Sequence, residues 1–142
     1  MLATTAREFA LDFSPDSRWI LLVSDQSGRD ELYAAPVEGT GPQRALTSSG
    51  IGGGAWWLAD GRVLFTSPSG KQLLEVAVTS LENGDGLQVG EPRPAFLGRE
   101  LPSAQISPTA DGKRLLAVVP GEEGAGEHLT LLQNWPAAIE GR

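Results

Sequence analysis

The sequence predicts an all-β protein made of repeated antiparallel sheets, and three observations carry this prediction. First, the 142 residues contain one pattern three times: an apolar strand end, a turn with an aspartate, a basic residue and an apolar run. Second, the copies, at residues 13–18, 57–62 and 107–113, recur at roughly the 40–50-residue period of β-propeller blades. Third, no segment has the periodicity of a capped helix. We therefore expect about three four-stranded antiparallel blades of a partial β-propeller.

The first copy is expected to form a complete four-stranded unit. Residues 19–24 are an apolar run, which is typical of a strand buried on both faces. Pro15 presets the backbone of the turn before this run, and the polar residues beside it can bond the local backbone. A hairpin loop follows at residues 25–30. The expected strands span residues 8–13, 19–24, 31–37 and 43–47.

The second and third copies repeat this order with changes. In the second copy, Asp60-Gly61 predicts a tight hairpin turn because glycine accepts a positive φ. A long polar excursion then spans residues 79–94. In the third copy we expect the turn to be longer than the first by Thr109 and Ala110, with no outer strand after residue 133. The expected strands span residues 55–58, 62–67, 73–78 and 95–97 in the second copy, and 104–107, 114–119 and 128–133 in the third.

These units define the expected domain organisation. Blades are expected at residues 1–47, 48–100 and 101–136, followed by a C-terminal tail at 137–142. The tail ends in Ile139-Glu140-Gly141-Arg142, which matches a protease site often used in expression vectors. It is either a cloning scar or a natural end, and it takes no part in the fold prediction.

Charge and composition exclude several classes of function. Eighteen acidic residues against 11 basic ones give a net charge of −7, which disfavours a nucleic-acid partner because phosphate binding needs a basic stripe. The chain has no cysteine, so disulfides, thiolate catalysis and cysteine zinc sites are excluded. No apolar stretch approaches the length of a membrane span, so no membrane insertion by this segment is expected.

No catalytic, cofactor or metal site is expected. His128 is the only histidine, and no Gly-x-Ser-x-Gly nucleophile motif occurs. Asp25, Asp30 and Glu31 surround Gly28, but their spacing does not match a calcium loop. The residue pattern at 50–55 matches the Gly-x-Gly-x-x-Ala dinucleotide fingerprint. A strand and turn follow these residues instead of the required helix, so we expect a loop between blades.

Three residues are candidates for an interaction surface: Trp56, Asp25 and Arg29. Trp56 neighbours Trp57 on the opposite face of the same expected strand, and tryptophan is enriched at interfaces. The alternative is that Trp56 packs between two blades. Asp25 and Arg29 belong to the hairpin loop at residues 25–30, for which the alternative is a solvated hairpin.

The repeats resemble those of TolB-like propellers, also called PD40 or WD40-like repeats. The resemblance lies in Ser14-Pro15-Asp16-Ser17-Arg18 and in Ala55-Trp56-Trp57-Leu58-Ala59-Asp60-Gly61-Arg62, where Leu58-Ala59 replaces the usual Ser-Pro. The stretch from Val89 through Asn134-Trp135 is similar to the last blades of sensor propellers in bacterial membrane-anchored serine/threonine kinases and winged-helix regulators.

This resemblance implies a ligand- or protein-binding module from the C-terminal part of a larger signalling protein, with further blades upstream. A kinase-like parent would place the module outside the cytoplasm; otherwise the module is expected in the cytoplasm. One alternative is a fragment that gates a prolyl-oligopeptidase-like serine hydrolase, and another is a decayed gene fragment. Because three blades leave faces and edges uncovered, we expect the isolated chain to be marginally stable or to self-associate.

Overall fold

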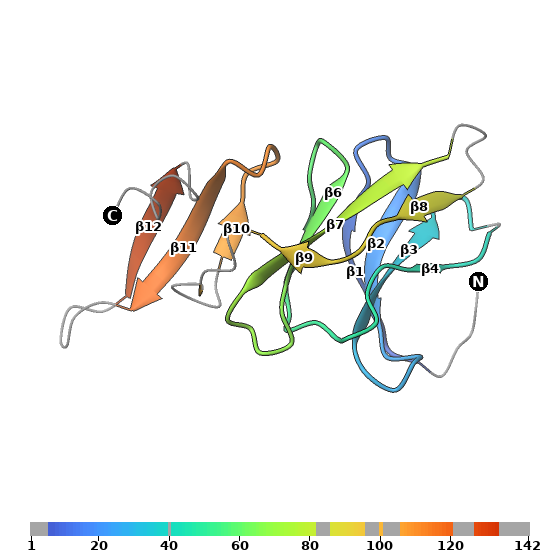
Figure 1. Cartoon of the computed structure of the whole chain (residues 1–142), viewed down its shortest axis with the longest axis horizontal. Coiled ribbons are helices and arrows are strands. Elements are labelled where there is room, and N and C mark those ends of the chain that lie inside the picture. The colour runs from blue at the N-terminus through green and yellow to red at the C-terminus, as the bar shows by residue number, and fades with distance from the viewer. Residues whose placement is uncertain are drawn as a thin grey trace.

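The described part of the chain consists of β-strands joined by turns (Figure 1). This computed structural model describes residues 6–39, 41–81, 86–95, 100, 106–120 and 127–133, with only the backbone at 118–120 and 127–133. All pairings between the named strands are antiparallel, and the strands form three separate sheets in chain order. The expected all-β fold class is confirmed.

Sheet 1 is the four-stranded meander predicted for the first copy, in the order β1-β2-β3-β4. Its pairing is regular except for a bulge in β1 between Ala10 and Asp12. The apolar run of β2 is almost entirely buried, as the sequence predicts. The strands are β1 (Glu8–Phe13), β2 (Trp19–Ser24), β3 (Glu31–Pro36) and β4 (Arg44–Ala45).

Sheet 2 differs from the prediction at its outer edge. The outer strand expected at residues 95–97 is instead β9 (Arg93–Pro94), while residues 96 and 97 lie outside the described residues. The polar excursion also contains an unexpected strand, β8 (Leu87–Val89). Both fit because β7 is eight residues long, so that its first half pairs with β9 and its second half with β8. The remaining strands are β5 (Ala55–Trp57), β6 (Arg62–Thr66) and β7 (Leu73–Ser80).

Sheet 3 contains β10 (Ile106–Pro108), β11 (Arg114–Pro120) and β12 (Glu127–Gln133). The longer turn expected here is wrong, because Ser107 and Pro108 belong to β10 and pair with β11. The turn begins at Thr109, whose N–H bonds the Arg114 carbonyl at 2.9 Å, and has the same length as the first turn. The expected strand residues 104 and 105, and the chain after residue 133, lie outside the described residues.

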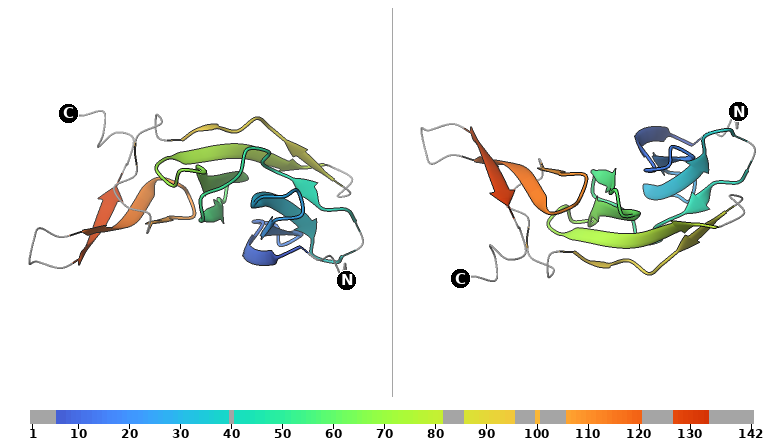
Figure 2. Two further views of the ribbon diagram at one scale, coloured as in Figure 1. Left: turned by 90° about the horizontal axis from the view of Figure 1, so that it is seen from below. Right: turned by 90° about the horizontal axis from the view of Figure 1, so that it is seen from above.

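The three sheets lie side by side in chain order, from the N-terminal sheet to the C-terminal one (Figures 1 and 2). Two apolar clusters fill the spaces between them. Between sheets 1 and 2, the buried residues are Trp19, Leu21, Val23, Leu32, Ala34, Leu46, Ala55, Trp57, Val63, Phe65, Val76, Val78 and Leu87. Between sheets 2 and 3, they are Leu58, Leu64, Leu73, Ala95 and Leu115.

Strands of the central sheet therefore contribute to both cores. Successive side chains of a strand point to opposite faces of the sheet. In β6, Phe65 joins the cluster shared with sheet 1, whereas Leu64 joins the cluster shared with sheet 3. This alternation explains why the β6 sequence reads as a continuous apolar run.

Candidate functional site

The three repeated aspartates hold the backbone of three equivalent turns. Each carboxylate accepts the N–H of the residue two positions later, at 3.1 Å from Asp16, 3.0 Å from Asp60 and 2.9 Å from Asp111. The residue after each aspartate has a positive φ: 59° at Ser17, 93° at Gly61 and 70° at Gly112. The local backbone bonding predicted for the first turn is confirmed, and the other two turns share it.

Hydroxyl groups reinforce the first and third turns. Ser14 Oγ and Thr109 Oγ1 each donate a 2.6 Å hydrogen bond to the aspartate two residues later. These bonds lower the pKa of Asp16 and of Asp111, because they stabilise the ionised carboxylate. In the second turn Leu58 takes this position and joins the core between sheets 2 and 3. The departure from the Ser-Pro pattern thus exchanges a turn bond for a contact with the next sheet.

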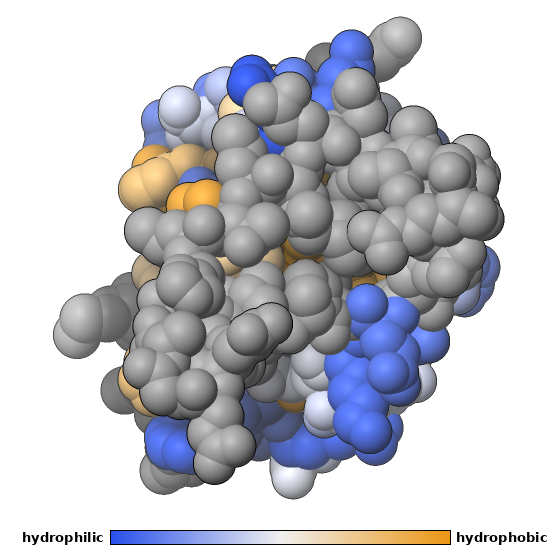
Figure 3. Space-filling view, turned by 90° about the vertical axis from the view of Figure 1, so that its left-hand side faces the viewer, coloured by the Kyte–Doolittle hydropathy of each residue, from blue (hydrophilic) through white to orange (hydrophobic). Residues whose placement is uncertain are grey.

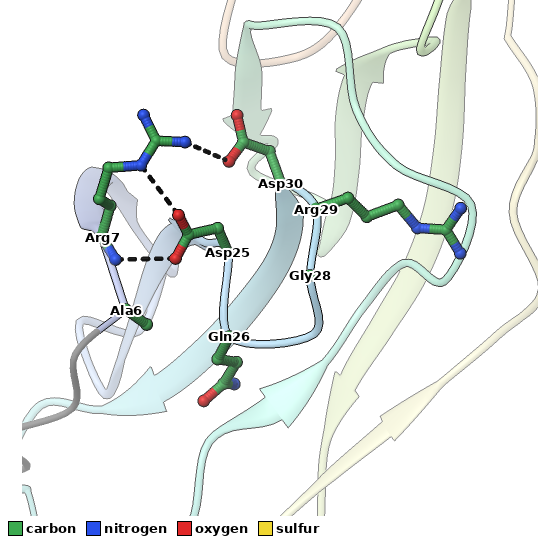
Figure 4. A pocket seen from close by; sticks show the side chains of 7 residues that line it. All are labelled: Ala6, Arg7, Asp25, Gln26, Gly28, Arg29 and Asp30. Atoms are coloured by element: carbon green, nitrogen blue, oxygen red, sulfur yellow. Dashed lines mark hydrogen bonds and ion pairs between the residues drawn. The ribbon is translucent and has the colours of Figure 1, made fainter.

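The hairpin loop between β2 and β3 carries the best-organised polar site in the described residues. Asp25 accepts both the backbone N–H and the Nε–H of Arg7, each at 2.8 Å. The same guanidinium lies 3.6 Å from Asp30. The hydrogen bond from the Arg7 side chain lowers the pKa of Asp25. Figure 4 shows these three side chains pointing toward one another across an open hollow.

Arg29 lies on the other side of this loop, pointing away from Arg7 (Figure 4). Its Nε donates to Glu31 at 2.9 Å, and its Nη2 donates to the Ser48 carbonyl at 2.6 Å. Arg29 nevertheless lines the same hollow, which has a volume of ≈ 590 Å³. The lining residues are Ala6, Arg7, Asp25, Gln26, Gly28, Arg29 and Asp30.

Glu31 positions Arg29, whereas from the sequence it was considered only for a calcium loop. Its side chain is buried, and besides Arg29 it accepts hydrogen bonds from the Thr47 hydroxyl and from the Gly50 N–H. A buried carboxylate is costly unless it is paired and hydrogen-bonded, and here it has all of these partners. The sequence signal for a buried role was a glutamate at the start of a strand that otherwise reads as apolar.

Trp56 lies apart from this loop site. It is half-buried and packs against the cluster between sheets 2 and 3. Its ring also lies over the backbone at Gly54, where an added Cβ would be 2.5 Å from the ring. Asp25 and Arg29 thus line the same hollow, although the Arg29 side chain points away from Arg7, and Trp56 lies in the packing between sheets.

The glycine-rich segment at residues 50–55 connects sheets 1 and 2, and strand β5 follows it. Gly52 approaches the Ser67 carbonyl so closely that an added Cβ would lie 2.1 Å from that oxygen. The prediction of a connecting loop, rather than a dinucleotide fingerprint, is confirmed, because no helix follows.

The described residues show no group of three or more His, Asp or Glu side chains that could hold a metal ion. His128 lies in β12, paired with Val119 in the register of sheet 3. In the same ranges, no helix is long and apolar enough to cross a membrane.

Of the comparisons with known proteins, the search of solved structures found similar chains. No family model matches the sequence, and no curated protein matches it. Similar solved structures include an oligogalacturonate lyase from Vibrio parahaemolyticus, with 16% identity and a TM-score of 0.46 over 76% of this chain and 27% of that one. Another is TolB from Acinetobacter baumannii, with 17% identity and a TM-score of 0.46 over 94% of this chain and 42% of that one. A proposed TolB from Agrobacterium tumefaciens has 18% identity and a TM-score of 0.41 over 89% of this chain and 43% of that one.

This chain therefore spans less than half the length of each of these three structures. At these TM-scores the likenesses carry no argument about function. Two of the three are described as TolB structures. The resemblance to kinase and regulator propellers stays a prediction.

Proposed function

We propose that the chain is a non-catalytic binding module of propeller blades, and that it binds a protein ligand through the loop between β2 and β3. The observation that carries this proposal is the hollow beside Arg7, Asp25 and Arg29, in which the Arg7–Asp25 ion pair holds both charges in place, while Glu31 holds Arg29 from the other side of the loop. Loops on a rigid sheet scaffold are where binding residues concentrate.

The electrostatics of the hollow favour a polar peptide segment that carries both donors and acceptors. The side chains of Arg7 and Arg29 are 68% and 62% exposed although each is ion-paired, and that of Asp30 is 52% exposed. Side chains that are already held in position lose less conformational entropy when a ligand binds. Both charge signs are present within one hollow, which suits a partner with alternating charges.

In a larger protein, this module would be the sensor part of a signalling protein, as the resemblance of its last blades implies. The blade limits at residues 1–47, 48–100 and 101–136 belong to this proposal. Signal recognition by such a module needs no reacting group, which agrees with a single histidine and no cysteine in the sequence.

A displayed library of random peptides tests the proposal. Peptides selected on the unmodified protein are measured against Arg7→Ala and Arg29→Ala, and against the matched control Lys71→Ala, which removes an exposed cation outside the hollow. We expect the two arginine variants to weaken binding about tenfold or more, since hydrogen bonds to charged groups contribute about 1.5–3 kcal/mol. The control is expected to bind unchanged. Peptides that bind all variants equally would show that the hollow is not the binding site.

A further inference from the structure

The equivalent turns align the three sheets residue by residue. The N–H to carbonyl bond that closes each turn joins Ser14 to Trp19, Leu58 to Arg62 and Thr109 to Arg114. Counting onward from the carbonyl residue, Ile20, Val63 and Leu115 are equivalent. The next residues, Leu21, Leu64 and Leu116, are equivalent as well and lie on the opposite face of each sheet.

The first set faces the preceding sheet. Val63 of sheet 2 is 0% exposed beneath sheet 1, and Leu115 of sheet 3 is 0% exposed beneath sheet 2. Ile20 of sheet 1 is equally apolar but only half-buried. Its cross-strand partner Phe13, which is equivalent to the buried Trp57, is 57% exposed. We name Phe13, Ile20 and Ala35 the open back face of sheet 1.

The second set faces the following sheet. Here too the exposure of the side chain rises at the sheet that has no neighbour, which is now sheet 3. Leu21 faces sheet 2 and Leu64 faces sheet 3, and both are 0% exposed. Leu116, at the same position in sheet 3, is 40% exposed. We name the side of sheet 3 that carries Leu116 its open front face. Figure 3 views the molecule from this end and shows hydrophobic atoms reaching the surface beside hydrophilic ones.

We propose that a second copy of this chain covers both open faces. The front face of sheet 3 in one copy packs on the back face of sheet 1 in the other, which continues the stacking seen between sheets 1 and 2. Two such contacts related by a two-fold axis close a ring of about six sheets, and propellers commonly have four to eight blades. Contacts between two different faces end in a closed ring only when the rotation closes. Two copies would close the ring at about six sheets, within the usual range, whereas three copies would give about nine.

Charge opposes this association over long distances, because each copy carries a net charge of −7. Salt screens such repulsion, with a Debye length of about 10 Å at 0.1 M ionic strength. The apolar contact between the faces has no such dependence. We therefore expect the dimer to form at lower protein concentration in 0.5 M than in 0.02 M salt.

Light scattering over a concentration series measures the assembly directly. The chain has a mass of 15.0 kDa, so the closed pair is expected at about twice that value. Phe13→Asp and Leu116→Lys are each expected to give the monomer mass, because each places a charge in both contacts. The matched control is Phe9→Asp, since Phe9 lies on the same strand and is 59% exposed but shares the opposite face of the sheet with Val23. It is expected to leave the dimer intact.

Mixing the two disruptive variants tests the geometry of the contact. A mixed pair has one unmodified contact and one contact in which an aspartate faces a lysine, so the mixture is expected to regain the dimer mass. Far-UV circular dichroism checks that each variant keeps its strands.

Three results would overturn the proposal. The first is a monomer mass for the unmodified protein at every concentration, which would leave the open faces to blades of a longer protein. The second is a mass that rises beyond two copies, which would mean that the ring does not close. The third is loss of the dimer in Phe13→Asp but not in Leu116→Lys, which would indicate that two sheet 1 faces meet back to back. None of these depends on peptide binding at the β2–β3 loop, so the two proposals fail separately.

Discussion

The contact between sheets 1 and 2 differs in kind from the contact between sheets 2 and 3. Among the described residues, the first cluster holds thirteen buried apolar side chains and the second holds five. The first contact also has a carboxylate link, since Asp12 at the β1 bulge accepts the Trp57 N–H at 3.0 Å. The second contact instead joins two turns, through the Ala59 N–H and the Ala110 carbonyl at 2.8 Å. A repeated sequence thus produces one contact dominated by burial and one that depends on turn geometry.

The largest expected effect separates these two contacts within one strand. Phe65→Ala empties a site in the core between sheets 1 and 2, and we expect a loss of about 3–5 kcal/mol in the free energy of unfolding. Leu64→Ala acts on the opposite face, where we expect about 2–5 kcal/mol. Amide hydrogen exchange measured at increasing urea concentration distinguishes the two variants. Leu64→Ala should raise the exchange rate in β11 at lower urea than in β2, and Phe65→Ala should raise the exchange rates in β2 and β6 together. The reverse order would contradict this assignment of faces.

The next effect concerns Glu31, the buried carboxylate that bonds the segment connecting sheets 1 and 2 at Gly50. Glu31→Gln keeps the shape of the side chain but removes the charge that pairs with Arg29, and we expect a loss of about 3 kcal/mol in urea unfolding. The control Asp30→Asn changes an exposed carboxylate of the same loop, for which surface ion pairs suggest about 1 kcal/mol or less. Equal losses in both variants would show that burial of Glu31 contributes nothing.

A smaller effect isolates the turn contact between sheets 2 and 3. Gly112→Ala and Gly70→Ala both place a side chain at a positive φ, at 70° and 73°, and we expect each to cost about 1 kcal/mol for that reason. At Gly112 the new Cβ would also lie 2.7 Å from Leu58 Cδ1, while at Gly70 nothing lies within 4 Å. Thermal unfolding should therefore show a greater loss for Gly112→Ala, by about 1 kcal/mol or more. No difference between the variants would mean that Leu58 moves aside freely.

The smallest effect is the pH dependence of the turns. Hydrogen bonds from Ser14 and Thr109 lower the folded-state pKa of Asp16 and Asp111. A lowered folded pKa stabilises the protein above the unfolded value of about 3.9 and loses this contribution as the pH falls through the folded value. We expect the urea midpoint to fall only below about pH 4. In a carboxyl-carbon NMR titration, Thr109→Val should raise the pKa of Asp111 and leave that of Asp16 unchanged; a shift of both would contradict local control.

The sequence predicted the fold class and most strands because strand burial and turn chemistry are local signals. The third turn was misplaced because Ser107-Pro108 has the same sequence as Ser14-Pro15. The position of the turn is instead set by the aspartate and by the residue after it, which has a positive φ. Strand β8 was missed because its three residues become a strand only against the far half of β7.

The sequence predicted only part of the candidate site, because its contacts join residues that are far apart in the chain. Asp25 and Arg29 stand out in a hairpin loop, but Asp25 contacts Arg7, which is 18 positions away in the sequence. Glu31 is bonded by Thr47 and Gly50, which are 16 and 19 positions away. Such pairings depend on how strands and connections return, which spacing alone does not specify. Trp56 was a candidate for an interaction surface with packing between blades as the alternative, and its side chain packs against the cluster between sheets 2 and 3.

The most direct test of the stacked sheets is amide hydrogen exchange on the monomeric Phe13→Asp variant. We predict the slowest exchange in β2, β3, β6 and β7, which flank the larger core, and faster exchange in β11 as the edge of a smaller contact. Uniform protection across all three sheets, or the slowest exchange in β11, would contradict two unequal contacts between neighbouring sheets.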